Sequence, residues 1–242
     1  MSTVTHVRYE LLRTIRNRRM LAFSLGLPLV LFYAVGSAQR HAHTDGIAFP
    51  LYFMVGMAVY GALFAAVGPG ARIALDRSRG WTRQLRITPL SVRVTFLGRV
   101  LTAYIVALPS LIVLYLAGAT LGVHLSVGQY LELTGWLLLG LAPIVLIGII
   151  LGHLLTSDAL APAVGGVVVF FALFGGAWGR FFNGGVMSTL VKLLPSYWMV
   201  DAGHDAVHGG GWPAEAWIVI AAWIVVLVPL AALVYRRDTR RV

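Results

Sequence analysis

The chain has no cysteine, a single lysine and only nine acidic residues among its 242 positions. Without cysteine, neither a disulfide nor a thiolate-bound metal centre can form within it. Charged residues make up 12% of the sequence, whereas a soluble domain carries about 25%. Hydrophobic residues make up 59%, so the composition indicates an integral membrane protein.

A phosphate-binding loop for ATP is also missing. A Walker A loop follows the pattern G-x-x-x-x-G-K-[ST], in which the lysine reaches the terminal phosphates of the nucleotide. The only lysine, Lys192, stands between Val191 and Leu193 in an apolar stretch. This excludes a P-loop ATPase. We expect no catalytic residue, no bound cofactor and no metal ion in this chain.

The few charges that are present are mostly positive. The formal net charge is +10 at pH 7, and it comes almost wholly from arginine. A nucleic acid is one common partner of so basic a protein, but a soluble nucleic-acid-binding protein would not be this apolar. We therefore interpret the charge as a determinant of membrane topology and as a surface for anionic membrane lipid, with no nucleic-acid partner.

Six apolar runs are long enough to cross a hydrocarbon core of about 30 Å, which takes roughly 20 helical residues. We expect an all-α membrane protein with one transmembrane domain over residues 1–242. The expected spans are 20–37, 49–71, 94–119, 131–155, 160–178 and 216–235. The first run is as long as a span, and no small-residue cleavage site clearly follows it, so we expect it to remain as a helix.

Arginine is concentrated in three segments: residues 1–19, the connection 72–99, and the residues after the last span. Of the nineteen basic residues, all but Arg40, Arg180 and Lys192 fall in them. Positive residues are retained on the cytoplasmic side of a membrane. We therefore expect both termini in the cytoplasm of a multi-pass protein of the plasma membrane.

Residues 4–19 precede the first span and predict an amphipathic helix on the membrane surface. Its apolar positions recur at three- and four-residue spacing and include Val7, Leu11 and Ile15. Arginines such as Arg16 lie between them, as in interfacial helices. The alternative is a solvated basic tail.

The outer connection 179–215 is too long for a plain loop and contains an apolar stretch, so we expect a re-entrant segment of one or two short helices. His204 and His208 lie one helical turn apart, which is the H-E-x-x-H spacing of zinc helices with Asp205 at the general-base position. No third ligand is evident in the sequence. A hydrated helix end that stops at 209–211 is the interpretation we favour.

Few ionisable residues lie in or near the apolar runs; they include Arg99, Glu132, His153 and Asp158. Each can reach a membrane interface by extending along the helix. A proton relay needs several acids at mid-membrane depth, and the sequence offers none. An ion-coupled secondary transporter or channel without an ATPase partner is therefore only the alternative function.

Glycine is abundant, with 27 residues. Pairs four positions apart, such as Gly148-x-x-x-Gly152, let helix backbones approach closely in membranes. So many glycines produce some matches by chance, and no dimer interface is assigned from them.

The connection between the second and third spans carries a recognisable order of elements. Gly80-Trp81 is followed by a short helical stretch, then by Thr88-Pro89-Leu90-Ser91 and by Gly98-Arg99 before the third span. This order resembles the cytoplasmic loop of the permease subunit of a type-2 ABC transporter. One departure is that many members carry Gly-Thr-Leu-Glu where this chain has Gly80-Trp81-Thr82-Arg83.

The resemblance implies six transmembrane helices, the interfacial helix, a cytoplasmic coupling helix within 72–93, and a re-entrant outer hairpin before the sixth span. It also implies an exporter-like efflux function. Two copies of the permease, or one copy and a paralogue, would assemble with two ABC ATPase subunits that bind ATP and Mg. The substrate would be an amphipathic, drug-like or lipidic molecule moved out of the cell.

The coupling helix would dock into the ATPase subunit. The resemblance assigns this docking to ten residues: Arg77, Arg79, Gly80, Trp81, Arg83, Leu85, Arg86, Thr88, Pro89 and Leu90. Their arginines suit an acidic partner surface, and Trp81 is the type of aromatic anchor that dominates interface energy. The alternative is a loop that contacts the inner leaflet.

Overall fold

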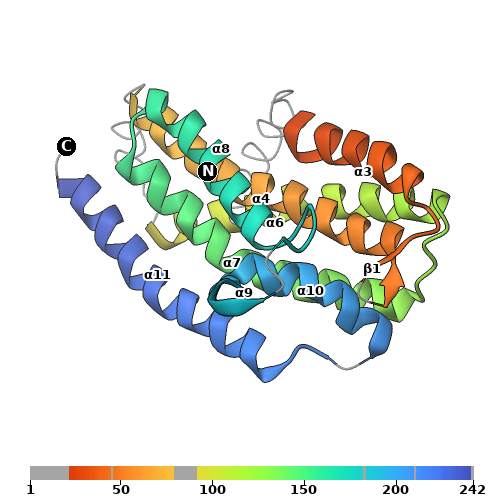
Figure 1. Ribbon diagram of the computed structural model, residues 1–242. Coiled ribbons are helices and arrows are strands. Elements are labelled where there is room, and N and C mark those ends of the chain that lie inside the picture. The colour runs from red at the N-terminus through yellow and green to blue at the C-terminus, as the bar shows by residue number, and fades with distance from the viewer. Residues whose placement is uncertain (1–21, 45, 79–91, 182–183, 210, 241–242) are drawn as a thin grey trace.

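A computed structural model of the chain describes residues 22–44, 46–78, 92–181, 184–209 and 211–240. The interfacial helix expected over 4–19 and most of the expected coupling loop lie outside these ranges. The structure that is described is almost entirely helical (Figure 1).

Within the described ranges, five helices are long and apolar enough to cross a membrane. They are α4 (Phe49–Ser78), α6 (Val92–Thr120), α7 (Val127–Leu154), α8 (Ser157–Phe174) and α11 (Ala214–Arg240). At 1.5 Å per residue, the shortest of them, with 18 residues, measures about 27 Å. The protein is therefore a multi-pass membrane protein.

The first apolar run is shorter. It forms a π-helical turn, η1 (Ala22–Gly26), followed by α3 (Leu27–Ala38), in which Pro28 occupies the first turn. Because the expected span begins at residue 20, part of it lies outside the described ranges. The count of six spans stays a prediction.

Helix α4 forms the centre of the bundle (Figure 1). In the most apolar 18-residue stretch of α4, 89% of the helix is buried, although this stretch is hydrophobic enough to face lipid. It contacts α3, α6, α7, α8 and α10. Helix α11 packs mainly on α7 and lies along one edge of the bundle.

The two ends of the bundle differ. At one end, here named the hairpin end, β1 (His43–Thr44) pairs antiparallel with β2 (Ile47–Ala48), and the turn 121–126 joins α6 to α7. At the other, the loop end, α4 stops at Ser78, α6 begins at Val92, and α7 passes into α8. In Figure 1 the loop end lies at the left, together with the C-terminal end of α11.

The sharp turn before α7 has a local cause. Gly122 adopts a φ of +87°, which favours glycine. Ser126 then caps α7: its hydroxyl accepts a hydrogen bond from the Gln129 amide at 3.3 Å, and its own amide donates to the Gln129 side chain at 2.8 Å. This capping box satisfies two amides at the helix start.

The long connection before α11 contains α9 (Gly185–Val191) and α10 (Pro195–His208). Helix α10 packs against α4 and α7, and Met199 is fully buried there. Gly203 makes this packing possible, since a Cβ on it would lie 2.9 Å from Val55. The helix ends at Gly209, whose φ is +70°.

Candidate functional site

The structure describes only one of the ten predicted docking residues, Arg77. The other nine, within 79–90, and the four interfacial residues Val7, Leu11, Ile15 and Arg16 lie outside the described ranges. The helices on both sides of the coupling loop are described, however. The loop end of the bundle is therefore where the candidate site can be examined.

Arg77 lies in the last turn of α4 and contacts α7. Residues 72–78 were expected in the cytoplasmic connection, and the structure describes them as the last part of α4, which ends at Ser78. The Arg77 guanidinium donates from Nη1 to the Gly152 carbonyl at 3.4 Å and also to the His153 carbonyl. In the structure, this predicted docking residue thus contacts its own chain.

The position of these carbonyls explains the contact. Helix α7 ends at Leu154, so Gly152 and His153 belong to its last turn, where carbonyls have no partner within the helix. A helix C-terminus carries a partial negative charge, which a guanidinium compensates. Arg77 therefore fastens the end of α4 to the end of α7.

About two to three turns before Arg77, α4 and α7 touch through glycine. A Cβ on Gly148 would lie 2.7 Å from the Cα of Val67, and one on Gly152 would lie 2.8 Å from the Cα of Gly70. Real side chains do not approach backbone so closely. The Gly148-x-x-x-Gly152 pattern therefore forms an intramolecular contact with α4.

Helix α7 also packs against α11 near the same end. The His153 ring meets the Tyr235 ring edge to face, with centroids 5.4 Å apart. A separate apolar cluster joins the same two helices: Leu146, Ile150, Leu227, Ala231 and Val234. A displacement of α4 at the loop end would therefore reach α7 directly and α11 through α7.

Arg99 was expected to reach a membrane interface, and its depth in the membrane stays a prediction. It lies on α6 near the loop end and is only 9% exposed. One turn after Gly98, the buried Thr102 hydroxyl donates to the Gly98 carbonyl at 2.8 Å, so this hydroxyl has a hydrogen-bond partner. Arg99, which belongs to the Gly98-Arg99 motif before the third span, is therefore a buried arginine near the start of α6.

At the hairpin end, α10 carries an acidic pair, Asp201 and Asp205. Asp201 forms an ion pair with Arg180. Burial raises the pKa of Asp205 to about 6, and the negative charges of Asp201 and Glu132 add to this shift, while His208 opposes it. Among the described residues, no three His, Asp or Glu side chains are grouped as metal ligands. The zinc interpretation gains no third ligand from them.

The raised pKa makes stability pH-dependent. Between about pH 4 and pH 6 the folded protein binds more protons than the unfolded chain, whose Asp205 has the ordinary pKa of 3.8. The free energy of unfolding therefore falls as the pH rises through this window. In Asp205→Asn we expect the thermal midpoint to change less between pH 7 and pH 5 than in the unmodified protein.

Asp158→Asn, which removes an exposed carboxylate from the start of α8, is the matched control for the pH experiment. We expect it to keep the pH response of the unmodified protein. Equal responses in Asp205→Asn and the unmodified protein would contradict the assignment.

The helices define a multi-pass membrane protein, and the comparisons define its family. The sequence model of the family described as "ABC-2 family transporter protein" matches residues 19–234, and the chain belongs to that family. It is also 23% identical, over 232 residues and 95% of both chains, to the protein named "Putative transport permease YvfS" from Bacillus subtilis (strain 168). The chain is a permease subunit of the type-2 ABC class, as the loop motif predicted.

Proposed function

We propose that this chain is the membrane subunit of an ABC exporter whose ATP is hydrolysed by a separate subunit. The single observation that carries the proposal is the match of residues 19–234 to the family of ABC-2 transporter proteins. The contact of α4 with α7 at the loop end, through Arg77 and the glycines, suggests how movement of a docked loop would reach the bundle. Because the coupling loop continues directly from α4, a force on the loop is applied to the most buried helix of the bundle.

In this proposal, residues 79–90 dock into the ATPase subunit, while Arg77 holds α4 against α7. The ATP-driven closure of the ATPase subunit biases the permease between inward-open and outward-open states. The chain itself contributes only a difference in substrate affinity between those states. Two copies, or one copy with a paralogue, form the permease dimer in the plasma membrane. Both termini are cytoplasmic, on the side that carries sixteen of the nineteen basic residues.

The proposed substrate is amphipathic or lipidic and moves outward. Support comes from the apolar character of the helices that would line a path between two permease copies. The chain also has no large domain outside the membrane in the ranges described, where the longest connection holds only α9 and α10.

Trp81→Ala combined with Arg83→Glu tests the docking assignment. We expect the permease to lose most of its co-purifying ATPase subunit, because truncating an interface anchor costs about 2 kcal/mol or more, or roughly 30-fold in affinity. ATP turnover that responds to substrate should fall with it. The measurement is affinity co-purification followed by ATPase assay in proteoliposomes.

A matched control is Trp217→Ala combined with Arg40→Glu, which makes the same chemical changes at exposed residues. This control should keep both assembly and coupling. Undiminished assembly and coupling in the loop variant would refute the docking assignment. Transport by the permease alone, driven by an ion gradient, would instead favour the secondary-transporter alternative.

A further inference from the structure

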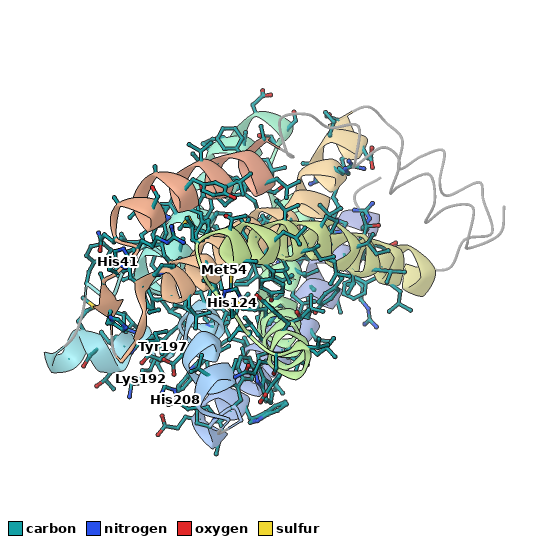
Figure 2. The ribbon with its side chains drawn as sticks, turned by 90° about the vertical axis from the view of Figure 1, so that its right-hand side faces the viewer. His41, Met54, His124, Lys192, Tyr197 and His208 are labelled. Carbon is teal, nitrogen blue, oxygen red and sulfur yellow. The ribbon has the colours of Figure 1, made fainter. Side chains whose placement is uncertain are left out.

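A cavity of about 360 Å³ lies between the end of α8, the turn after it, α9 and the start of α10. Its volume is within the range of about 300–1,000 Å³ that is typical of small-molecule sites. Figure 2 shows two of its lining residues, Lys192 and Tyr197, near one another beside α9 and α10.

The backbone around the cavity is held by hydrogen bonds from side chains. The Tyr52 hydroxyl of α4 donates to the Gly176 carbonyl at 2.7 Å. The Trp198 indole donates to the Lys192 carbonyl at 2.7 Å, and the Trp223 indole of α11 donates to the Leu193 carbonyl at 2.8 Å. The cavity is therefore preformed rather than dependent on a ligand.

Two cationic side chains line the cavity. Arg180 is oriented by its ion pair with Asp201, and its guanidinium lies 5.4 Å from the centroid of the Tyr197 ring. Lys192 is exposed and forms no ion pair with any described residue. No acidic side chain is among the described residues that line the cavity. The polar part of the cavity thus suits an anion.

The remaining wall is apolar and continues onto the lipid-facing surface of α8. Leu173 and Phe174 line the cavity. The Phe170 ring lies 4.9 Å from the Phe174 ring and is 46% exposed, and Val169 is 42% exposed one turn before Leu173. Apolar exposure on a spanning helix faces acyl chains. A ligand of this site would place an anionic group in the cavity and an apolar chain along α8.

We propose that this cavity binds the headgroup of an anionic phospholipid, with its phosphate between Arg180 and Lys192 and its acyl chains against Phe174 and Phe170. Tyr197 lines the same cavity, and tyrosine is a residue type that is enriched where proteins contact the membrane interface. The described residues that line the site include none of the predicted docking residues, and the site does not depend on the proposed export function.

The test uses Lys192 as the chain's only side-chain amine. The full chain is placed in lipid nanodiscs of phosphatidylcholine alone or with phosphatidylglycerol, neither of which carries a primary amine. An uncharged acetylating reagent is added, and the rate of Lys192 acetylation is followed by peptide mass spectrometry. We expect acetylation to be about fivefold slower with phosphatidylglycerol, as expected for about 80% occupancy of the site.

The double variant Lys192→Arg with Arg40→Lys is the matched control, because it moves the lone lysine to an exposed position outside the cavity. Its acetylation should differ little between the two lipids, which measures the general effect of an anionic surface. Equal slowing in the control and the unmodified protein would overturn the proposal. Equal protection of Lys192 by inorganic phosphate in phosphatidylcholine nanodiscs would also overturn it, since the site would then take a free anion.

A second measurement is the amount of phosphatidylglycerol retained on the detergent-purified chain, determined by native mass spectrometry. Lys192→Gln should lose a bound lipid that Lys192→Arg retains, because only the latter keeps the positive charge. Retention of the same lipid by both variants would contradict a headgroup contact at Lys192.

Discussion

Replacing Gly148 with valine is expected to force α4 away from α7 and to lower the thermal stability of the protein sharply. Even the first added carbon would lie 2.7 Å from the Cα of Val67 and 3.1 Å from the Ala66 carbonyl oxygen. These are backbone atoms of a buried helix, so neither can rotate away. Overpacking of this kind costs about 1–3 kcal/mol or more.

The expected loss can be measured as the unfolding midpoint of the purified protein. For a chain of this length, each kcal/mol corresponds to about 2–4 °C, so Gly148→Val should unfold roughly 5–10 °C lower. Gly135→Val provides the control on the same helix, since a Cβ there meets no atom within 4 Å. Similar midpoints for the two variants would show that the α4–α7 contact is looser than the structure describes.

Arg77→Gln is expected to weaken the contact between α4 and α7 at the loop end. The substitution removes the guanidinium that donates to two carbonyls of the last turn of α7. A hydrogen bond from a charged group contributes about 1.5–3 kcal/mol. We expect a lower unfolding midpoint and less transport per ATP hydrolysed, with the ATPase subunit still bound.

Whether the ATPase subunit stays bound to Arg77→Gln distinguishes two roles for Arg77. If it docks into the ATPase, as the resemblance implies, Arg77→Gln should reduce co-purification of the ATPase. If it positions α4 against α7, co-purification should persist while coupling falls. Arg77→Lys should restore part of the coupling, because an ammonium can still donate to a carbonyl. Arg237→Gln, which removes an exposed charge near the end of α11, should change neither property.

Helix positions could be predicted from hydrophobic runs, but helix ends could not. The second span was expected at 49–71, and the apolar run does not show that the helix itself continues to Ser78. Polar residues stay helical there because Arg77 finds acceptors on α7. The fifth run was expected to reach residue 178, yet α8 ends at Phe174, where Gly176 turns the chain with a φ of +83°. Neither end depends on hydrophobicity.

For the candidate site, too, local features could be predicted from the sequence and long-range contacts could not. The Thr88-Pro89-Leu90-Ser91 motif is local, so the family could be inferred from it, and the match over residues 19–234 confirmed that inference. The partners of Arg77 and Gly70 lie more than seventy residues away along the chain. No local pattern pairs residues at such separation.

The sequence alone determined that the chain is an apolar, arginine-rich membrane protein with no P-loop of its own, because composition and short motifs depend on each residue separately. It also indicated the family. Only the tertiary structure decided which helices touch: that α4 is buried at the centre, that Gly148 and Gly152 face α4, and that Arg180 and Lys192 share one cavity. Such contacts depend on how distant segments pack. Hydrophobicity drives burial but is non-directional, so it does not determine which helices pack together.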